Sequence, residues 1–150
     1  MERDKFFYEI TQQINDIRHK KQHELKRIKA EWPFVTGLIP RILIVIDEYR
    51  KFLDDKGIPI DFRNNGLSLD FKMHFSNGGQ YGFCIGFGSK ESLELCSYSS
   101  GPEPKGRTIH DSQVISSVTW KDELFEIFVQ TCIILFLEHE MQHGGYLQAR

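Results

Sequence analysis

Several features that this sequence lacks restrict its class before any motif is considered. The three cysteines, Cys84, Cys96 and Cys132, lie far apart and form no CxxC pair, which argues against zinc ribbons and dithiol redox motifs. The longest uninterrupted apolar run, 132–137, is too short to cross a membrane. The formal net charge is only -2, from 19 basic and 21 acidic residues, so the chain as a whole has no strong attraction for nucleic acid or lipid headgroups.

The start of the chain also lacks the features of a secretory leader. Residues 1–5 are mostly charged, and no small-residue cleavage site follows them. We therefore expect a cytoplasmic protein with reduced thiols and no membrane partner.

The sequence does contain enough apolar material for one folded domain. Its 150 residues include 12 phenylalanines, whose burial predicts a substantial core. The length corresponds to one ordinary domain. We expect a single domain over 1–150, and the order of its elements, described below, places it in the α+β class.

Residues 1–32 predict one long amphipathic helix. Apolar residues recur with three-four spacing, which places them on one helix face, until Lys21 and Glu24 interrupt the series. Pro33 disfavours helical geometry at the residue before it and so predicts the end of this helix. The apolar positions are Phe7, Ile10, Ile14, Ile17, Leu25, Ile28 and Trp32.

The second half of this helix is basic. The segment 18–29 holds six basic residues and one glutamate, a local charge of +5, which leaves -7 for the rest of a chain of net charge -2. Such an asymmetry suits docking on an acidic protein surface. Nucleic acid is less favoured, because no aromatic residues interleave with the basic ones. The candidate partner-binding residues are Arg18, Lys20, Lys21, Lys26 and Arg27.

The remaining pattern predicts a second helix, an antiparallel sheet and a last helix. Proline at 40 and glycine at 57 suit the two ends of a helix over 40–56, followed by a loop through 66. Alternating apolar residues over 67–75, the Asn77-Gly78 turn and a second alternating run predict a β-hairpin. Further strands are expected near 92–98 and 108–118, which gives a meander of three or four strands. A helix over 119–143 is apolar on nearly every side, so we expect it to be buried against the sheet.

The last helix ends in a motif that can carry chemistry. His139-Glu140-Met141-Gln142-His143 matches H-E-x-x-H, in which two histidines four residues apart face one zinc ion. The glutamate can then act as general base on the zinc-bound water. This segment resembles the active-site helix of zincin metallohydrolases, which implies His139 and His143 as zinc ligands and Glu140 as the catalytic residue.

A third zinc ligand has to be found upstream, because only seven residues follow His143. The segment Glu94-Leu95-Cys96-Ser97 resembles, loosely, the cysteine segment that precedes H-E-x-x-H in peptide deformylases. That resemblance implies Cys96 as the third ligand, with His74, His110 and Asp111 as reserves. The alternative is that the two histidines cap the end of a buried helix, where cationic imidazole favours the helix dipole.

Two functions of different class follow from these observations. The first is a small partner-binding protein without a cofactor, of the immunity, antitoxin-like or phage-inhibitor kind, which docks on another macromolecule. The second is a zinc-dependent hydrolase of peptidase or deformylase type. The half-apolar face of the first helix also suits packing on a second copy of the chain, as in a homo-oligomer.

Overall fold

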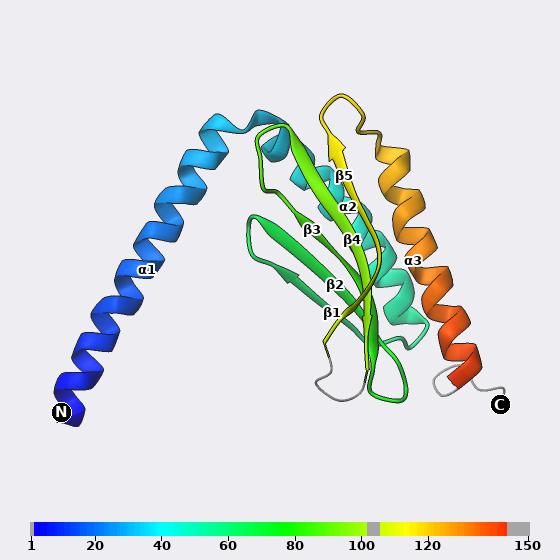
Figure 1. Ribbon diagram of the computed structural model, residues 1–150, viewed down its shortest axis with the longest axis horizontal. Helices are drawn as coiled ribbons and strands as arrows, with labels where there is room; N and C mark the ends of the chain where they lie inside the picture. Colours follow the sequence, from blue (N-terminus) through cyan, green and yellow to red (C-terminus); the bar gives the residue numbers. More distant parts are fainter. Residues whose placement is uncertain (1, 102–105, 144–150) are drawn as a thin grey trace.

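The computed structural model describes residues 2–101 and 106–143, the last two by their backbone only. It confirms the α+β class, with two N-terminal helices and a C-terminal helix packed on an antiparallel sheet (Figure 1). The sheet has five strands rather than three or four. The elements are α1 (Arg3–Glu31), α2 (Pro33–Asp55), β1 (Ile60–Asn64), β2 (Ser68–His74), β3 (Gln80–Gly86), β4 (Ser92–Ser100), β5 (Thr108–Ser116) and α3 (Asp122–His143).

The sheet is a simple meander in which each strand pairs with the next, always antiparallel. The β2–β3 hairpin turns at Gly78, whose φ of 93° is strained for other residues. Phe71 lies opposite Phe83 in this hairpin, and their rings stack at 5.1 Å. The expected core side chains Leu69, Phe71, Met73, Tyr81, Phe83 and Ile85 are all buried.

Helices α2 and α3 cover one face of the sheet side by side (Figure 1). The ring of Phe83 contacts Phe125 and Phe128 of α3, with centroids 6.2 and 5.6 Å apart. Between the two helices, the Tyr49 hydroxyl donates a hydrogen bond to Glu126, 2.9 Å away, and accepts one from Gln130 at 2.7 Å. Within the described residues, no helix is long and apolar enough to span a membrane.

The expected loop over 57–66 contains β1, which the sequence analysis missed. This edge strand is short and lies between Pro59 and an Asn-Asn-Gly turn, so its own residues give only a weak strand signal. Its pairing with β2, in which Phe62 lies opposite Phe71, supplies the hydrogen bonds that fix it. The strand therefore depends on its pairing with the neighbouring strand rather than on a pattern within its own residues.

The second helix begins at Pro33, one turn or more before the expected start at Pro40. Pro33 occupies the first turn, where its missing N–H costs nothing, and Pro40 lies inside the helix. An internal proline costs about 3 kcal/mol. The buried side chains of Val35, Leu38 and Ile42 continue with helical spacing across Pro40, and their burial offsets that cost.

Helix α3 packs on the sheet as expected, but only one of its apolar faces is buried. Phe125, Phe128 and Cys132 face the core and are at most 7% exposed. The outer face carries Ile127 and Ile134, which are 57% and 55% exposed. The helix therefore lies in the outer layer of a two-layer structure and presents apolar side chains to solvent.

The stacked pair at the centre of the hairpin predicts a large stability effect. Because Phe71 is 1% exposed, Phe71→Ala should lower the free energy of unfolding by about 3–5 kcal/mol. Urea denaturation measures this change. Val118→Ala, at a position 90% exposed, is the matched control and should shift stability by less than about 0.5 kcal/mol. A cost below about 1 kcal/mol for Phe71→Ala would contradict this packing.

Candidate functional site

Helix α1 projects from the body of the molecule as an arm (Figure 1). Of its 29 residues only Ile28 is buried. Isolated helices are at best marginally stable in water, and in proteins most of a helix's stability comes from packing its apolar face. A helix of this length with its side chains in solvent therefore lacks most of the packing that stabilises helices in proteins.

The last turns of α1 are anchored to the body. Leu25 lies over Gly66, where an added Cβ would be only 2.9 Å from the leucine Cδ2 atom. Ile28 is 4% exposed, and a hollow of about 230 Å³ remains between these residues, Val35 and Leu67. The Trp32 amide donates to the carbonyl of Ile28, so α1 runs into α2 through a single residue. This anchor fixes the direction of the arm.

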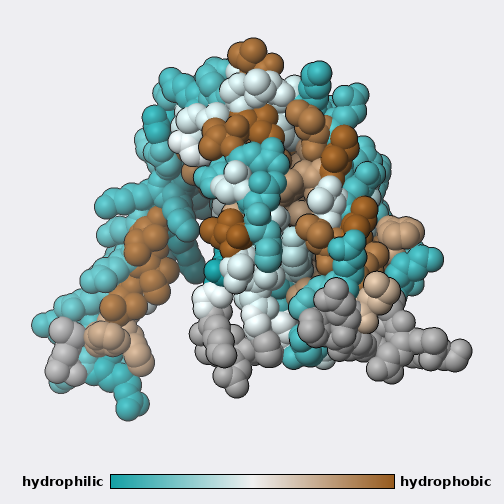
Figure 2. All heavy atoms as spheres, turned by 45° about the vertical axis from the view of Figure 1, so that its right-hand side comes forward, coloured by the Kyte–Doolittle hydropathy of each residue, from teal (hydrophilic) through white to brown (hydrophobic). Residues whose placement is uncertain are grey.

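The N-terminal part of the arm carries the uncovered apolar stripe that the sequence predicts. Phe7, Ile14 and Ile17 are 57%, 42% and 58% exposed. Phe6 and Tyr8 flank the stripe and are also exposed. Figure 2 shows hydrophobic side chains gathered along the arm. Single exposed apolar residues are ordinary, but a continuous band marks an interaction surface.

The basic segment follows this apolar stripe along the same helix. Arg18, Lys20, Lys21 and Lys26 are exposed, and no salt bridge joins them to another described residue. Arg27 differs, because its guanidinium pairs with Glu24 at 2.5 Å and with Glu31 at 3.3 Å. The structure thus brings the predicted residues together on one helix and leaves Arg27 the least available of them.

The H-E-x-x-H segment forms the end of α3, beside the β2–β3 turn. The ring of His139 lies 4.0 Å from that of Phe75. The Glu140 side chain is 1% exposed and accepts a hydrogen bond from the Ser76 amide, at 3.3 and 3.4 Å from its two oxygens. The side chain of His143 lies outside the described residues.

Cys96, the predicted third ligand, lies on the face of the sheet opposite α3. Cys96 pairs with Cys84 across β3 and β4, and the strand alternation directs both away from the face that carries Phe83 and α3. Burial, with Cys96 alongside, raises the pKa of the Cys84 thiol to about 11. The part of the chain that the structure describes contains no group of three His, Cys, Asp or Glu side chains able to hold a metal. Zinc binding stays a prediction.

The described reserve ligands do not form a metal-binding group with His139. Asp111 lies opposite Ser97, on the face of the sheet that carries Phe83, and burial together with the charge of Asp111 raises the pKa of Cys132 in α3. His74 follows the same alternation as Asp70 and Lys72, on the face opposite α3. His110 on β5 hydrogen-bonds the Ser99 hydroxyl at 2.7 Å and stacks on Tyr81, while Asp111 accepts from Gln113. These side chains have structural partners within the sheet.

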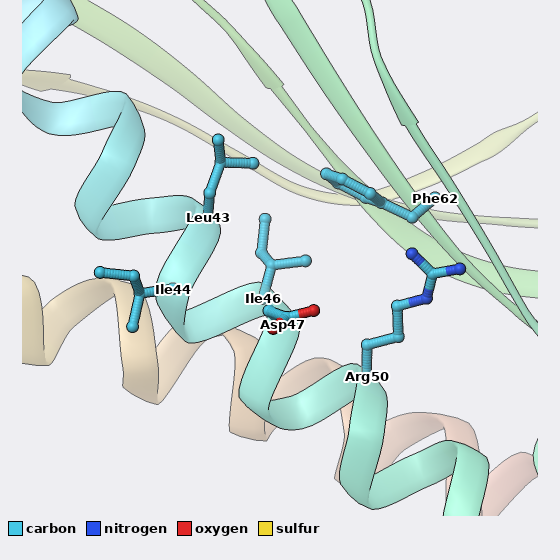
Figure 3. A pocket seen from close by; sticks show the side chains of 6 residues that line it. All are labelled: Leu43, Ile44, Ile46, Asp47, Arg50 and Phe62. Carbon is cyan, nitrogen blue, oxygen red and sulfur yellow. The ribbon is translucent and has the colours of Figure 1, made fainter.

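A hollow of about 320 Å³ lies between α2 and β1 (Figure 3). Leu43, Ile46 and Phe62 form its apolar walls, and Arg50 extends towards Phe62. Asp47 is paired with Lys51 at 3.1 Å. The lining contains no histidine, cysteine or serine, so this hollow has none of the usual groups for nucleophilic or metal-assisted catalysis.

No family model, curated protein or solved structure matches this chain. The candidate site therefore rests on geometry and charge. Sequence reasoning found the arm and its stripe but missed the exposed stripe of α3. Leu124, Ile127 and Ile134 have helical spacing in the sequence. Buried apolar residues stand between them, so the sequence alone does not separate the exposed stripe from the buried one.

The buried Glu140 carboxylate predicts a structural effect that can be separated from catalysis. Glu140→Ala removes the acceptor for the Ser76 amide and should lower the free energy of unfolding by about 1–3 kcal/mol. Glu140→Gln keeps a side-chain oxygen at this position and should cost less. Denaturant unfolding of the three proteins measures both changes.

Metal analysis of the same proteins is the control. The zinc hypothesis predicts that Glu140→Gln keeps bound zinc and loses hydrolysis, and that His139→Ala loses the metal. One zinc per chain in the purified protein, absent from His139→Ala, would contradict a purely structural role for this segment.

Proposed function

We propose that this protein is a small binding protein that docks on another macromolecule through α1. The observation that carries the proposal is that a 29-residue helix holds a single buried side chain while large apolar residues along it remain exposed. An amphipathic helix that lays its apolar face into a groove is a recurrent mode of protein recognition. The fold supports this mode, because the anchor at Leu25 and Ile28 holds the helix away from the body.

The chemistry of the arm specifies the surface that it fits. Phe7, Ile14 and Ile17 require an apolar groove, and Arg18, Lys20 and Lys21 require acidic groups at one end of it. Complementary charge raises the rate of association and selects the partner, while the apolar contact supplies most of the affinity. The partner is therefore a protein with an apolar groove and acidic margins.

This chemistry agrees with an immunity, antitoxin-like or inhibitor protein, which acts by covering a partner. Three free cysteines agree with a reducing compartment, so we place the protein in the cytoplasm. The zinc hydrolase remains the alternative function, but a catalytic base needs access to a metal-bound water, and Glu140 is almost fully buried.

Variants of the two parts of the arm test the proposal. The full chain, the stripe variant Ile14→Ala/Ile17→Ala and the charge variant Arg18→Glu/Lys20→Glu/Lys21→Glu are used to capture partners, and binding of the identified, purified partner is then measured by surface plasmon resonance. The stripe variant should dissociate at least about tenfold faster. The charge variant should associate more slowly, with a weaker salt dependence.

Two controls keep this experiment specific. Gln12→Ala changes the polar side of the arm and should bind like the unaltered chain. Circular dichroism and urea unfolding should hardly change for the charge variant, because exposed charges contribute little to stability. Unaltered binding by both the stripe and charge variants would remove α1 from the interface.

A further inference from the structure

The outer face of α3 carries a second uncovered apolar stripe. Leu124, Ile127 and Ile134 are 44%, 57% and 55% exposed, and Met141 continues the series at 79%. Leu135 flanks it and is 39% exposed. In Figure 2, where the α3 side of the molecule is turned forward, hydrophobic side chains are visible both on the arm and on the body. The protein thus has two helical apolar stripes that its own fold leaves in solvent.

The two stripes have the same spacing. In α1 the positions are 7, 10, 14 and 17, and in α3 they are 124, 127, 131 and 134. All of these are apolar except Thr131. Identical alternation of three and four residues is the condition for two helices to pack side chains between each other along one seam. Residues 7–17 span about 16 Å of helix, so four layers of side chains can interlock.

The charges of the two helices are complementary. Within its 22 residues α3 has no lysine or arginine, and it carries the exposed Glu123 near one end and the exposed Glu138 near the other. On α1 the basic residues Arg18, Lys20 and Lys21 follow the stripe, whereas Arg3 and Lys5 before it alternate with Glu2 and Asp4. When the stripes are aligned, the basic end of the α1 stripe lies beside Glu138 of α3 if the helices run parallel and beside Glu123 if they run antiparallel. Reversal of the relative direction preserves this match.

A chain cannot bring its own stripes together in this structure. Leu25 and Ile28 fix α1 beside the loop before β2, and Figure 1 shows α1 and α3 on opposite sides of the sheet. A second copy carries the surface that the arm requires, an apolar helix face with acidic margins.

We propose that the protein forms a reciprocal dimer in which the apolar stripe of α1 from each copy packs along the outer stripe of α3 from the other. This inference rests on the proposed function, since it names the surface that covers the arm. The contact occurs twice in the dimer and covers all four stripes of the pair. Arg18, Lys20 and Lys21 then lie near one acidic end of α3 in the other copy. This contact fixes the alignment of the two helices along each other.

Charge reversal in two separate chains tests the reciprocity. The first variant is Arg18→Glu/Lys20→Glu/Lys21→Glu, in α1, and the second is Glu123→Lys/Glu138→Lys, in α3. Each variant alone places like charges across both contacts. It should therefore raise the dissociation constant of the dimer by about tenfold or more. In an equimolar mixture, one contact joins two unaltered helices and the other joins two reversed helices, so the mixed dimer should form again. Sedimentation velocity of the full chains over a range of micromolar concentrations measures each result.

The control is Lys90→Glu, a charge reversal at an exposed bend that belongs to neither helix, which should dimerise like the unaltered chain. A monomeric unaltered chain at every concentration overturns the dimer. If the α3 variant dimerises like the unaltered chain, the pairing with α3 is overturned and the contact lies between two copies of α1. Failure of the mixture to regain dimers overturns the reciprocal exchange.

Apolar variants separate this inference from the proposed function. Ile14→Ala/Ile17→Ala in α1 and Ile127→Asp in α3 should both weaken the dimer, and circular dichroism verifies that each variant folds. A chain that stays monomeric, yet captures a different protein in a manner that Ile14→Ala/Ile17→Ala abolishes, contradicts the dimer and supports the proposed function. A monomeric chain whose partner capture is unaffected by the same change contradicts both.

Discussion

The covered face of the sheet has room for two helices, and this constraint decides the rest of the structure. Five strands about 4.8 Å apart make a sheet about 24 Å wide, and helices pack about 8–10 Å from one another. Helices α2 and α3 fill that width, held together by Tyr49, Glu126 and Gln130. Helix α1 therefore finds no space in this layer. Its last turns rest on Gly66 and Leu67, and the remainder extends into solvent.

The same constraint explains why apolar side chains are exposed in two places. A helix in a two-layer fold buries one stripe, and α3 buries the one that contains Phe125 and Phe128. Its opposite stripe, like that of α1, has no layer above it. An exposed apolar stripe lowers the solubility of a protein when nothing covers it. The stripes of α1 and α3 match each other in spacing and in charge. Exposed surfaces therefore support the proposed function, since the hollow between α2 and β1 is lined by no histidine, cysteine or serine and Glu140 is held inside the body.

Much of the fold could be predicted from local patterns. Strict alternation around Phe71 and the Asn77-Gly78 turn predict the β2–β3 hairpin, because these signals act over few residues. Strand β1 could not be predicted, because its pairing with β2 fixes it and its own residues give only a weak signal. The start of α2 at Pro33 could not be predicted either, because burial of its first turns decides it. The candidate site divides in the same way. The stripe and basic segment of α1 follow from spacing, but H-E-x-x-H says nothing about solvent access, and the structure alone shows Glu140 beneath the turn at Ser76.

The central claim is that residues 4–24 lack packing in the single chain and acquire it on association. Hydrogen–deuterium exchange of the full chain, at low and high concentration, measures this directly. At low concentration, amides of 4–24 should exchange rapidly, while those near the anchor at Ile28 and throughout α2 remain protected. At high concentration, protection should extend into 4–24, and the amides of α3 should exchange more slowly. Strong protection of 4–24 at every dilution would contradict the account, because it would mean that the isolated chain already covers its own arm.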